Sequence, residues 1–188
     1  PTQQTPGSDG TSTVYTLKNG KPITEENVIE MLKEIEKQYP SGSPWSADPD
    51  SPHNPNPVSE TLLNHFPAVS ATYACGGFAA MVSDMIFPPE CEARILTDFS
   101  KVRPGDIAFD AYRDKYGMIL VTHVWVALGP CVHSDMVTGP EEAEWMIVGR
   151  ADGNMGGKIS WGWPNFDEII QKYNGWTPVY PEGTAPIV

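Results

Sequence analysis

The chain has 188 residues, which is enough for one domain with a hydrophobic core and too few for two ordinary ones. Its formal net charge of −12 excludes the broad positive surface that binds nucleic acid or anionic membranes. The 40% hydrophobic content suffices for a core, and no apolar run reaches the ~18 residues that a membrane-spanning helix needs. We expect one folded domain without a membrane span, and we expect it to be a monomer.

The beginning of the chain is polar. Residues 1–13 are mostly Thr, Gln, Ser, Gly and Pro, which predicts a flexible tether over residues 1–20 and a single domain over residues 21–188. A polar tether often follows a removed leader peptide, and a cloning boundary would give the same start. Between the two we expect export, to the cell envelope or the exterior.

The first predicted helix begins after Thr24, a favourable N-cap residue followed by two glutamates. Apolar residues then recur every three or four positions until Pro40, which indicates an amphipathic helix. Proline recurs from Pro40 to Pro57, so this segment is expected to be an ordered or semi-ordered loop. Trp45 is the apolar residue that could anchor the loop to the body.

A second helix is predicted from Cys75 to Phe87, apolar on a wide face and therefore central. Gly76, near its start, suits a close approach of the backbone to another chain or a ligand. The period then changes to two, which predicts an antiparallel sheet and an α+β fold with the helices leading. The predicted strands are Ile107–Tyr112, Met118–Leu128 and Glu144–Ala151, and a short helix is predicted over Asn165–Tyr173.

Cys75 is the first candidate for chemistry. It stands at the predicted start of the apolar helix, where unpaired N–H groups and the helix dipole favour a thiolate. Considered alone, a cysteine at this position is equally compatible with a small buried core residue.

His123 is the second candidate, because its polar ring interrupts an apolar strand and needs a partner. Asp152 and Asn154 follow the third strand, and in extended backbone they point to one side. Either side chain could orient His123, and an ordinary turn around Gly153 is the alternative. A nucleophile, a base and an orienting group in this order are the parts needed for attack on an amide.

These residues resemble the papain-like cysteine hydrolases of bacterial cell walls, the CHAP and NlpC-type amidase and peptidase domains. The resemblance covers about residues 72–162, with Ala74 where the family usually has a polar residue and Asp152 where it more often has Glu. The matching segments are Ala-Cys-Gly-Gly-Phe at 74–78, Arg-Pro-Gly-Asp at 103–106, Thr-His-Val-Trp-Val at 122–126 and Ala-Asp-Gly-Asn at 151–154.

The resemblance implies a papain-like fold and hydrolysis of an amide bond in peptidoglycan, either the sugar–peptide amide or a peptide link, without a metal or other cofactor. It assigns Cys75 as the nucleophile, His123 as the base, and Asp152 or Asn154 as the group that orients the imidazole. Tyr73, Gly76 and Trp125 are the expected oxyanion and substrate contacts. A catalytically silent binding module of the same fold and an acyl transferase are the alternatives.

The other two cysteines leave one question open. Three cysteines are an odd number, and in an exported protein Cys91 and Cys131 could form a disulfide.

Overall fold

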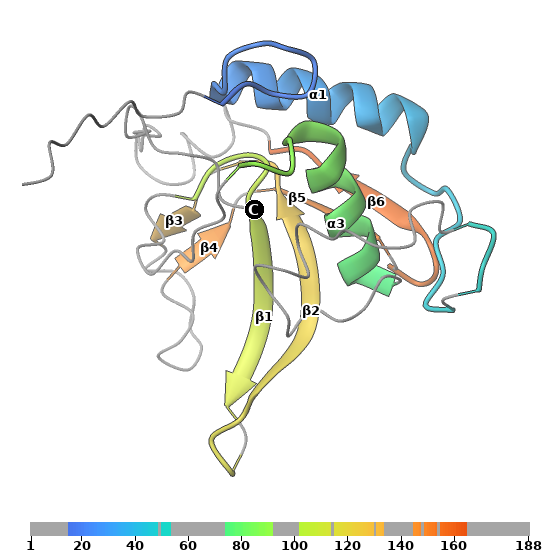
Figure 1. Cartoon of the computed structure of the whole chain (residues 1–188). Coiled ribbons are helices and arrows are strands. Elements are labelled where there is room, and N and C mark those ends of the chain that lie inside the picture. Colours follow the sequence, from blue (N-terminus) through green and yellow to red (C-terminus); the bar gives the residue numbers. More distant parts are fainter. Residues whose placement is uncertain are drawn as a thin grey trace, which may run out of the picture.

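The structure is a computed structural model of the chain that describes residues 15–48, 50–53, 74–91, 102–113, 115–129, 131–133, 145–147, 149–153 and 155–164. In this part of the chain, helices α1 (Glu25–Gln38) and α3 (Ala74–Ile86) pack with a four-stranded antiparallel sheet, which confirms the α+β class (Figure 1). The strand order is β1-β2-β5-β6, and β3 and β4 form a separate pair. The strands are β1 (Ile107–Arg113), β2 (Ile119–Ala127), β3 (Cys131–His133), β4 (Trp145–Ile147), β5 (Arg150–Gly153) and β6 (Ile159–Gly162).

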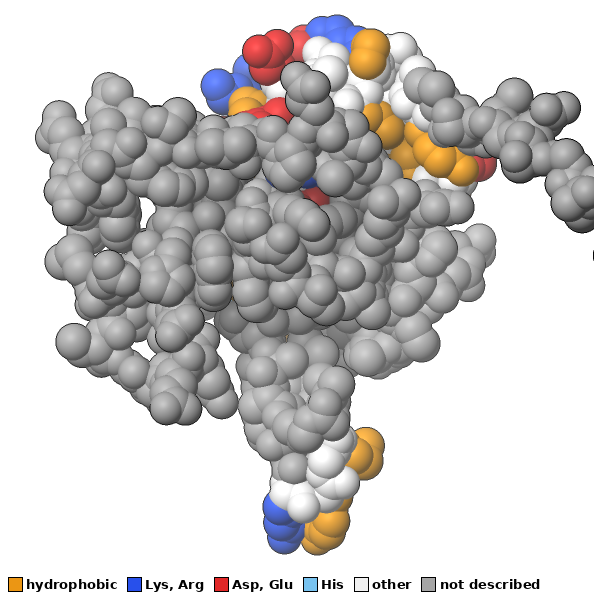
Figure 2. All heavy atoms as spheres, turned by 90° about the vertical axis from the view of Figure 1, so that its left-hand side faces the viewer, with side chains coloured by type: hydrophobic (Ala, Val, Ile, Leu, Met, Phe, Trp, Pro, Cys, Tyr) orange, Lys and Arg blue, Asp and Glu red, His pale blue; other side chains and the backbone are white. Residues whose placement is uncertain are grey.

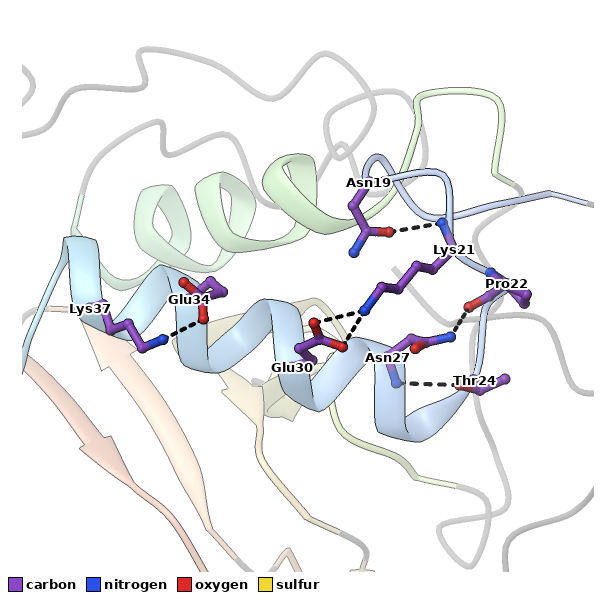
Figure 3. A network of polar contacts seen from close by, with 8 residues as sticks. All are labelled: Asn19, Lys21, Pro22, Thr24, Asn27, Glu30, Glu34 and Lys37. Carbon is purple, nitrogen blue, oxygen red and sulfur yellow. Dashed lines mark hydrogen bonds and ion pairs between the residues drawn. The ribbon is translucent and has the colours of Figure 1, made fainter.

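Helix α1 forms as its sequence predicts. The Thr24 hydroxyl accepts a hydrogen bond from the Asn27 N–H at 3.3 Å, which satisfies a free donor of the first turn. Ion pairs join Lys21 to Glu30 and Lys37 to Glu34 along the exposed side of the helix (Figure 3). The buried side consists of Val28, Leu32 and Ile35.

Helix α3 is the central element, packing against β2, β5 and α1. Its Phe78 side chain is fully buried and contacts two tryptophans edge-to-face, Trp45 at 5.4 Å and Trp161 at 5.8 Å between ring centroids. The loop that precedes α3 in sequence therefore contributes to the core, as expected for Trp45, which is 1% exposed. Neither described helix has the length and apolar character needed to cross a bilayer.

The segment before α1 also belongs to the folded body. Leu17 is 2% exposed, and the Lys18 N–H donates to the Ile86 carbonyl at the end of α3. The predicted tether over residues 1–20 therefore does not extend to residue 20. Residues 1–14 lie outside the described part.

The Arg-Pro-Gly-Asp segment makes the turn that leads into β1. Gly105 has a φ of +92°, and a Cβ at this position would lie 2.8 Å from Cγ1 of Val28. Asp106 is 4% exposed and its carboxylate accepts a hydrogen bond from the Arg103 N–H at 2.8 Å. Both residues of this turn thus have a structural role. Gly105 leaves room for Val28 of α1, and the Asp106 side chain holds the turn by its hydrogen bond to the Arg103 N–H.

Strands β1 and β2 form a hairpin that extends well beyond the other strands, since β5 pairs with β2 only at Val126 and Ala127 (Figure 1). The end of the hairpin projects from the body in Figure 2, with apolar and basic side chains on it. Tyr116 is 77% exposed there, and Lys115 lies 4.9 Å from the centre of its ring.

The C-terminal strands differ from the prediction. The segment predicted as one strand, Glu144–Ala151, contains β4 and the start of β5, separated at Gly149, whose φ is +80°. Strands β3 and β6 were not predicted, because three or four residues give too short a periodic pattern. The helix predicted at Asn165–Tyr173 lies outside the described residues.

Candidate functional site

The start of α3 is held in a strained backbone conformation. Ala74, the first residue of the helix, has a φ of +54°, which costs a residue with a Cβ of the order of 1–2 kcal/mol. Its N–H donates to the Ser46 carbonyl at 3.0 Å, and its carbonyl accepts from the Trp45 indole at 2.7 Å. Both backbone groups of the residue before Cys75 are thus fixed by the proline-rich loop. Cys75 follows as a partly buried free thiol.

His123 and Asp152 form a hydrogen-bonded pair of which only the aspartate is fully buried. His123 Nε2 lies 2.6 Å from Asp152 Oδ2, with the histidine side chain 25% exposed and the aspartate side chain 1% exposed. A carboxylate oxygen only accepts, so Nε2 carries the proton of a neutral ring and Nδ1 keeps a lone pair. The pair therefore provides a base at Nδ1 and a carboxylate that stabilises the ring when it is protonated.

The ladder between β1 and β2 is irregular next to this histidine. His123 pairs with Asp110 and Val121 pairs with Ala111, so that Thr122 is an extra residue on β2. Such a bulge bends a strand and changes the direction of the neighbouring side chain. Of the two candidate orienting residues, Asp152 makes the hydrogen bond, and Asn154 lies outside the described residues.

The sheet has two faces, which we call the helix face and the far face. The helix face carries Val124, Val126, Ala151 and Gly153. The first three belong to the hydrophobic core around α3, which we call the core cluster, and Gly153 lies directly beneath Phe78 of that helix. Side chains alternate along strands, so His123, Trp125, Arg150 and Asp152 occupy the far face. The contacts agree, since His123 bonds Asp152 and Arg150 lies 5.7 Å from the Trp125 ring.

Cys75 packs against the core cluster on the helix-face side. It precedes Phe78 by one helical turn, which places it close to the end of β5. His123 lies near the same end, because its ring bonds Asp152, the residue before the last residue of β5. The two candidate groups thus approach one end of β5 from different faces. Among the described residues, no hydrogen bond joins the Cys75 thiol to the His123 ring.

Within the described part of the chain, two buried polar atoms have no hydrogen-bond partner: Trp125 Nε1 and the second carboxylate oxygen of Asp152, Oδ1. The register extends to place Trp125 and Asp152 next to each other on the far face. Trp125, predicted as a substrate contact, is only 8% exposed. This burial does not fit an exposed substrate contact.

The remaining candidates have simpler positions. Gly76 is buried within α3, and Tyr73 lies outside the described residues. Cys91 is a free thiol that is 1% exposed, so the structure contains no Cys91–Cys131 disulfide. Burial raises the pKa of the Cys91 thiol, and the neighbouring Glu90 carboxylate raises this pKa further. In the described ranges, no three His, Cys, Asp or Glu side chains are grouped to hold a metal ion.

Sequence reasoning did not find the strain at Ala74. Alanine has no preference for positive φ, so nothing in the residue type signals the conformation. The resemblance itself marked the position, because the family usually has a different residue there.

The comparisons with known proteins give no further assignment. No family model matches the chain, and neither the search of curated proteins nor that of solved structures found a match.

Proposed function

We propose that the chain is a cysteine hydrolase of the papain-like type that cleaves an amide bond. The observation that carries the proposal is the 2.6 Å contact between His123 Nε2 and the buried carboxylate of Asp152. A histidine whose Nε2 proton is held by a buried carboxylate has a single lone pair for catalysis, at Nδ1. Ala74, the residue before Cys75, adds support. Its backbone is strained and is hydrogen-bonded through both its N–H and its carbonyl, and backbone strain is concentrated at functional sites.

The proposed reaction uses three groups of this chain. The first step requires the Cys75 thiol and His123 Nδ1 to meet around the end of β5: the ring nitrogen takes the thiol proton, and the thiolate attacks the carbonyl carbon of the amide. The protonated ring then gives the proton to the leaving amine, which leaves a thioester on Cys75. Water, deprotonated by the same nitrogen, hydrolyses the thioester and restores the thiol. Asp152 holds the Nε2 proton throughout.

The developing oxyanion needs a donor near the nucleophile. The Cys75 N–H belongs to the first turn of α3, where backbone donors are not used within the helix. It is the donor that we assign to the oxyanion, as in other acyl-transfer sites that use the N–H of the nucleophile itself. The proposed substrate is a peptidoglycan amide, on the resemblance described above, and the proposed location is the cell envelope or the exterior.

A catalytically silent binding module of the same fold is the second candidate. It is favoured by the placement of Cys75 and His123 on different sides of the sheet, without a hydrogen bond between them. In this case His123–Asp152 is a structural hydrogen-bonded pair, and Cys75 is a small packing residue.

The two candidates predict different reactivities of the Cys75 thiol. In a hydrolase, iodoacetamide alkylates Cys75 rapidly near pH 6, and His123→Ala slows the reaction by at least about tenfold because the base is lost. In a silent module, alkylation is slow and independent of His123. Cys91, which is buried, provides the internal standard for an unreactive thiol in the same digest.

Turnover is tested with purified muropeptides analysed by mass spectrometry. The hydrolase proposal expects cleavage by the wild-type chain, none by Cys75→Ala, and unchanged cleavage by Cys91→Ala as the matched control. Cleavage by the Cys75→Ala variant at the wild-type rate would refute the assignment of the nucleophile.

A further inference from the structure

The two backbone groups of Ala74 are bonded by one short segment of the proline-rich loop. Among the described residues, Ala74 is the one non-glycine residue with a positive φ. Its carbonyl receives the Trp45 indole N–H at 2.7 Å, and its own N–H is bonded to the Ser46 carbonyl at 3.0 Å. Two hydrogen bonds thus hold Ala74 in a backbone conformation that alanine otherwise avoids.

Trp45 is itself firmly held. Its backbone N–H donates to the Gly157 carbonyl at 2.9 Å, and its ring contacts Phe78 edge-to-face. The residues just before it pair with the start of β6, where Ile159 donates to the Ser43 carbonyl at 2.9 Å. The indole N–H is therefore a fixed donor anchored to the β5–β6 hairpin.

The bonded carbonyl belongs to the peptide unit that joins Ala74 to Cys75. A peptide unit is planar and trans, so the oxygen of Ala74 and the N–H of Cys75 point in opposite directions in one rigid plane. A donor that fixes this oxygen also fixes the direction of the Cys75 N–H. Hydrogen bonding at the oxygen further polarises the peptide and strengthens its N–H as a donor.

We propose that Trp45 is a positioning residue that sets the Ala74–Cys75 peptide, and through it the Cys75 thiol and the N–H assigned to the oxyanion. The role of this N–H rests on the proposed function. The role of Trp45 in orienting Cys75 rests on the geometry alone. In this assignment Trp45 acts through one peptide unit, the one that joins Ala74 to Cys75.

The test replaces the donor and keeps the ring. Trp45→Phe removes the indole N–H and retains an aromatic side chain against Phe78. We expect the alkylation rate of Cys75 at pH 6 to fall about tenfold, the factor corresponding to one hydrogen bond. In muropeptide hydrolysis we expect kcat to fall by a similar factor, with KM changed less than about twofold, because the donor acts on the transition state.

Trp161→Phe is the matched control. Trp161 is also buried, also contacts Phe78, and donates its indole N–H to the Tyr39 carbonyl at 2.8 Å. The control loses the same kind of bond at the Tyr39 carbonyl, not at the Ala74–Cys75 peptide, so stability falls and the alkylation rate stays within about twofold of wild type. An equal loss of alkylation rate in both variants would reduce Trp45 to a packing residue.

A rescue experiment separates positioning from stability. Glycine adopts a φ of +54° without strain, so Ala74→Gly in the Trp45→Phe background should restore the alkylation rate to within about threefold of wild type. An unchanged rate in Trp45→Phe, or a reduced rate that Ala74→Gly does not restore, would overturn the proposal. If Trp45→Phe does not fold, hydrogen exchange of the wild-type indole protons decides, since fast exchange at Trp45 beside slow exchange at Trp161 would exclude the bond.

Failure of the proposed function has a different signature. If Cys75→Ala still hydrolyses muropeptides, or if wild type does not, the hydrolase proposal fails whatever the Trp45 variants show. The alkylation and exchange measurements need no turnover, so they test the positioning of Cys75 separately.

Discussion

The contact between β5 and α3 makes the most specific prediction about the body of the protein. A Cβ on Gly153 would lie 2.2 Å from Cβ and 2.5 Å from Cγ of Phe78. Carbon atoms in contact are about 3.5–4.0 Å apart, so Gly153→Ala requires a movement of more than about 1 Å. The closest atom is a Cβ, which cannot rotate away, so the helix or the strand must move as a whole.

We expect Gly153→Ala to lower the free energy of unfolding by about 2–3 kcal/mol. Overpacking of a filled core costs about 1–3 kcal/mol, and the rigid contact places this variant at the upper end. Alanine also lowers the conformational entropy of the unfolded chain, but this stabilises the folded state by only about 0.4–1 kcal/mol. The measurement is equilibrium unfolding in urea, followed by tryptophan fluorescence. The dependence of the unfolding free energy on urea concentration should be the same in the variant and in wild type.

Gly162→Ala is the control within the same sheet, because its Cβ would lie 3.4 Å from the Arg150 carbonyl, a much milder contact. Its unfolding free energy should stay within about 1 kcal/mol of wild type. Adding Phe78→Ala should not rescue Gly153→Ala, because alanine keeps the offending Cβ. A Gly153→Ala variant as stable as wild type, or full rescue by Phe78→Ala, would show that α3 does not rest on β5 as described.

Four further predictions concern single positions. Gly105→Ala should lower the unfolding free energy by at least about 2 kcal/mol in urea, since a φ of +92° and a crowded neighbour both oppose a Cβ, and a neutral result would contradict the turn. Asp152→Ala should reduce muropeptide hydrolysis by about 10²–10⁴-fold, because the His123 ring loses the hydrogen-bond acceptor of its Nε2 proton, and full activity would remove Asp152 from the site. Among the described residues the buried Trp125 indole N–H has no partner, so Trp125→Phe should leave stability in thermal unfolding unchanged or slightly raised, and a loss above about 2 kcal/mol would show that the indole N–H is hydrogen-bonded. The folded-state pKa of Cys91 is raised, so the stability that this thiol contributes is complete below the ordinary value of 9.0 and is lost as pH rises above it. Between pH 7 and pH 10 the free energy of unfolding in urea should therefore fall less in Cys91→Ala than in wild type. An equal fall in both proteins would contradict this.

The elements with long periodic patterns were predictable from the sequence. The predicted helix after Thr24 and the helix from Cys75 to Phe87 agree with α1 and α3 within one or two residues. The hairpin of β1 and β2 was also predicted, because its two segments form strands of seven and nine residues, long enough to be recognised from composition and from the turn residues between them. The shorter strands were missed or merged because tertiary pairing, not local pattern, determines them.

The site was predictable only in part. The spacing of Asp152 and Asn154 indicated that a side chain of this segment reaches His123, and the structure identifies Asp152. The face of the sheet that α3 covers could not be derived, because it depends on the close contact of Gly153 with Phe78 and on the bulge at Thr122. A one-residue change of register reverses every side chain of a strand, so such information is not present in the local pattern.

The bonds at the two ends of α3 determine how far the chain can be shortened. Lys18 donates to Ile86 at the last turn, while Trp45 and Ser46 bond Ala74 at the first. A fragment that starts near residue 72, where the family resemblance begins, would lack both attachments together with α1. Truncations from the N-terminus should therefore not go beyond residue 15. A chain cut further in would lose these contacts and tend to aggregate, so its inactivity would say nothing about its chemistry.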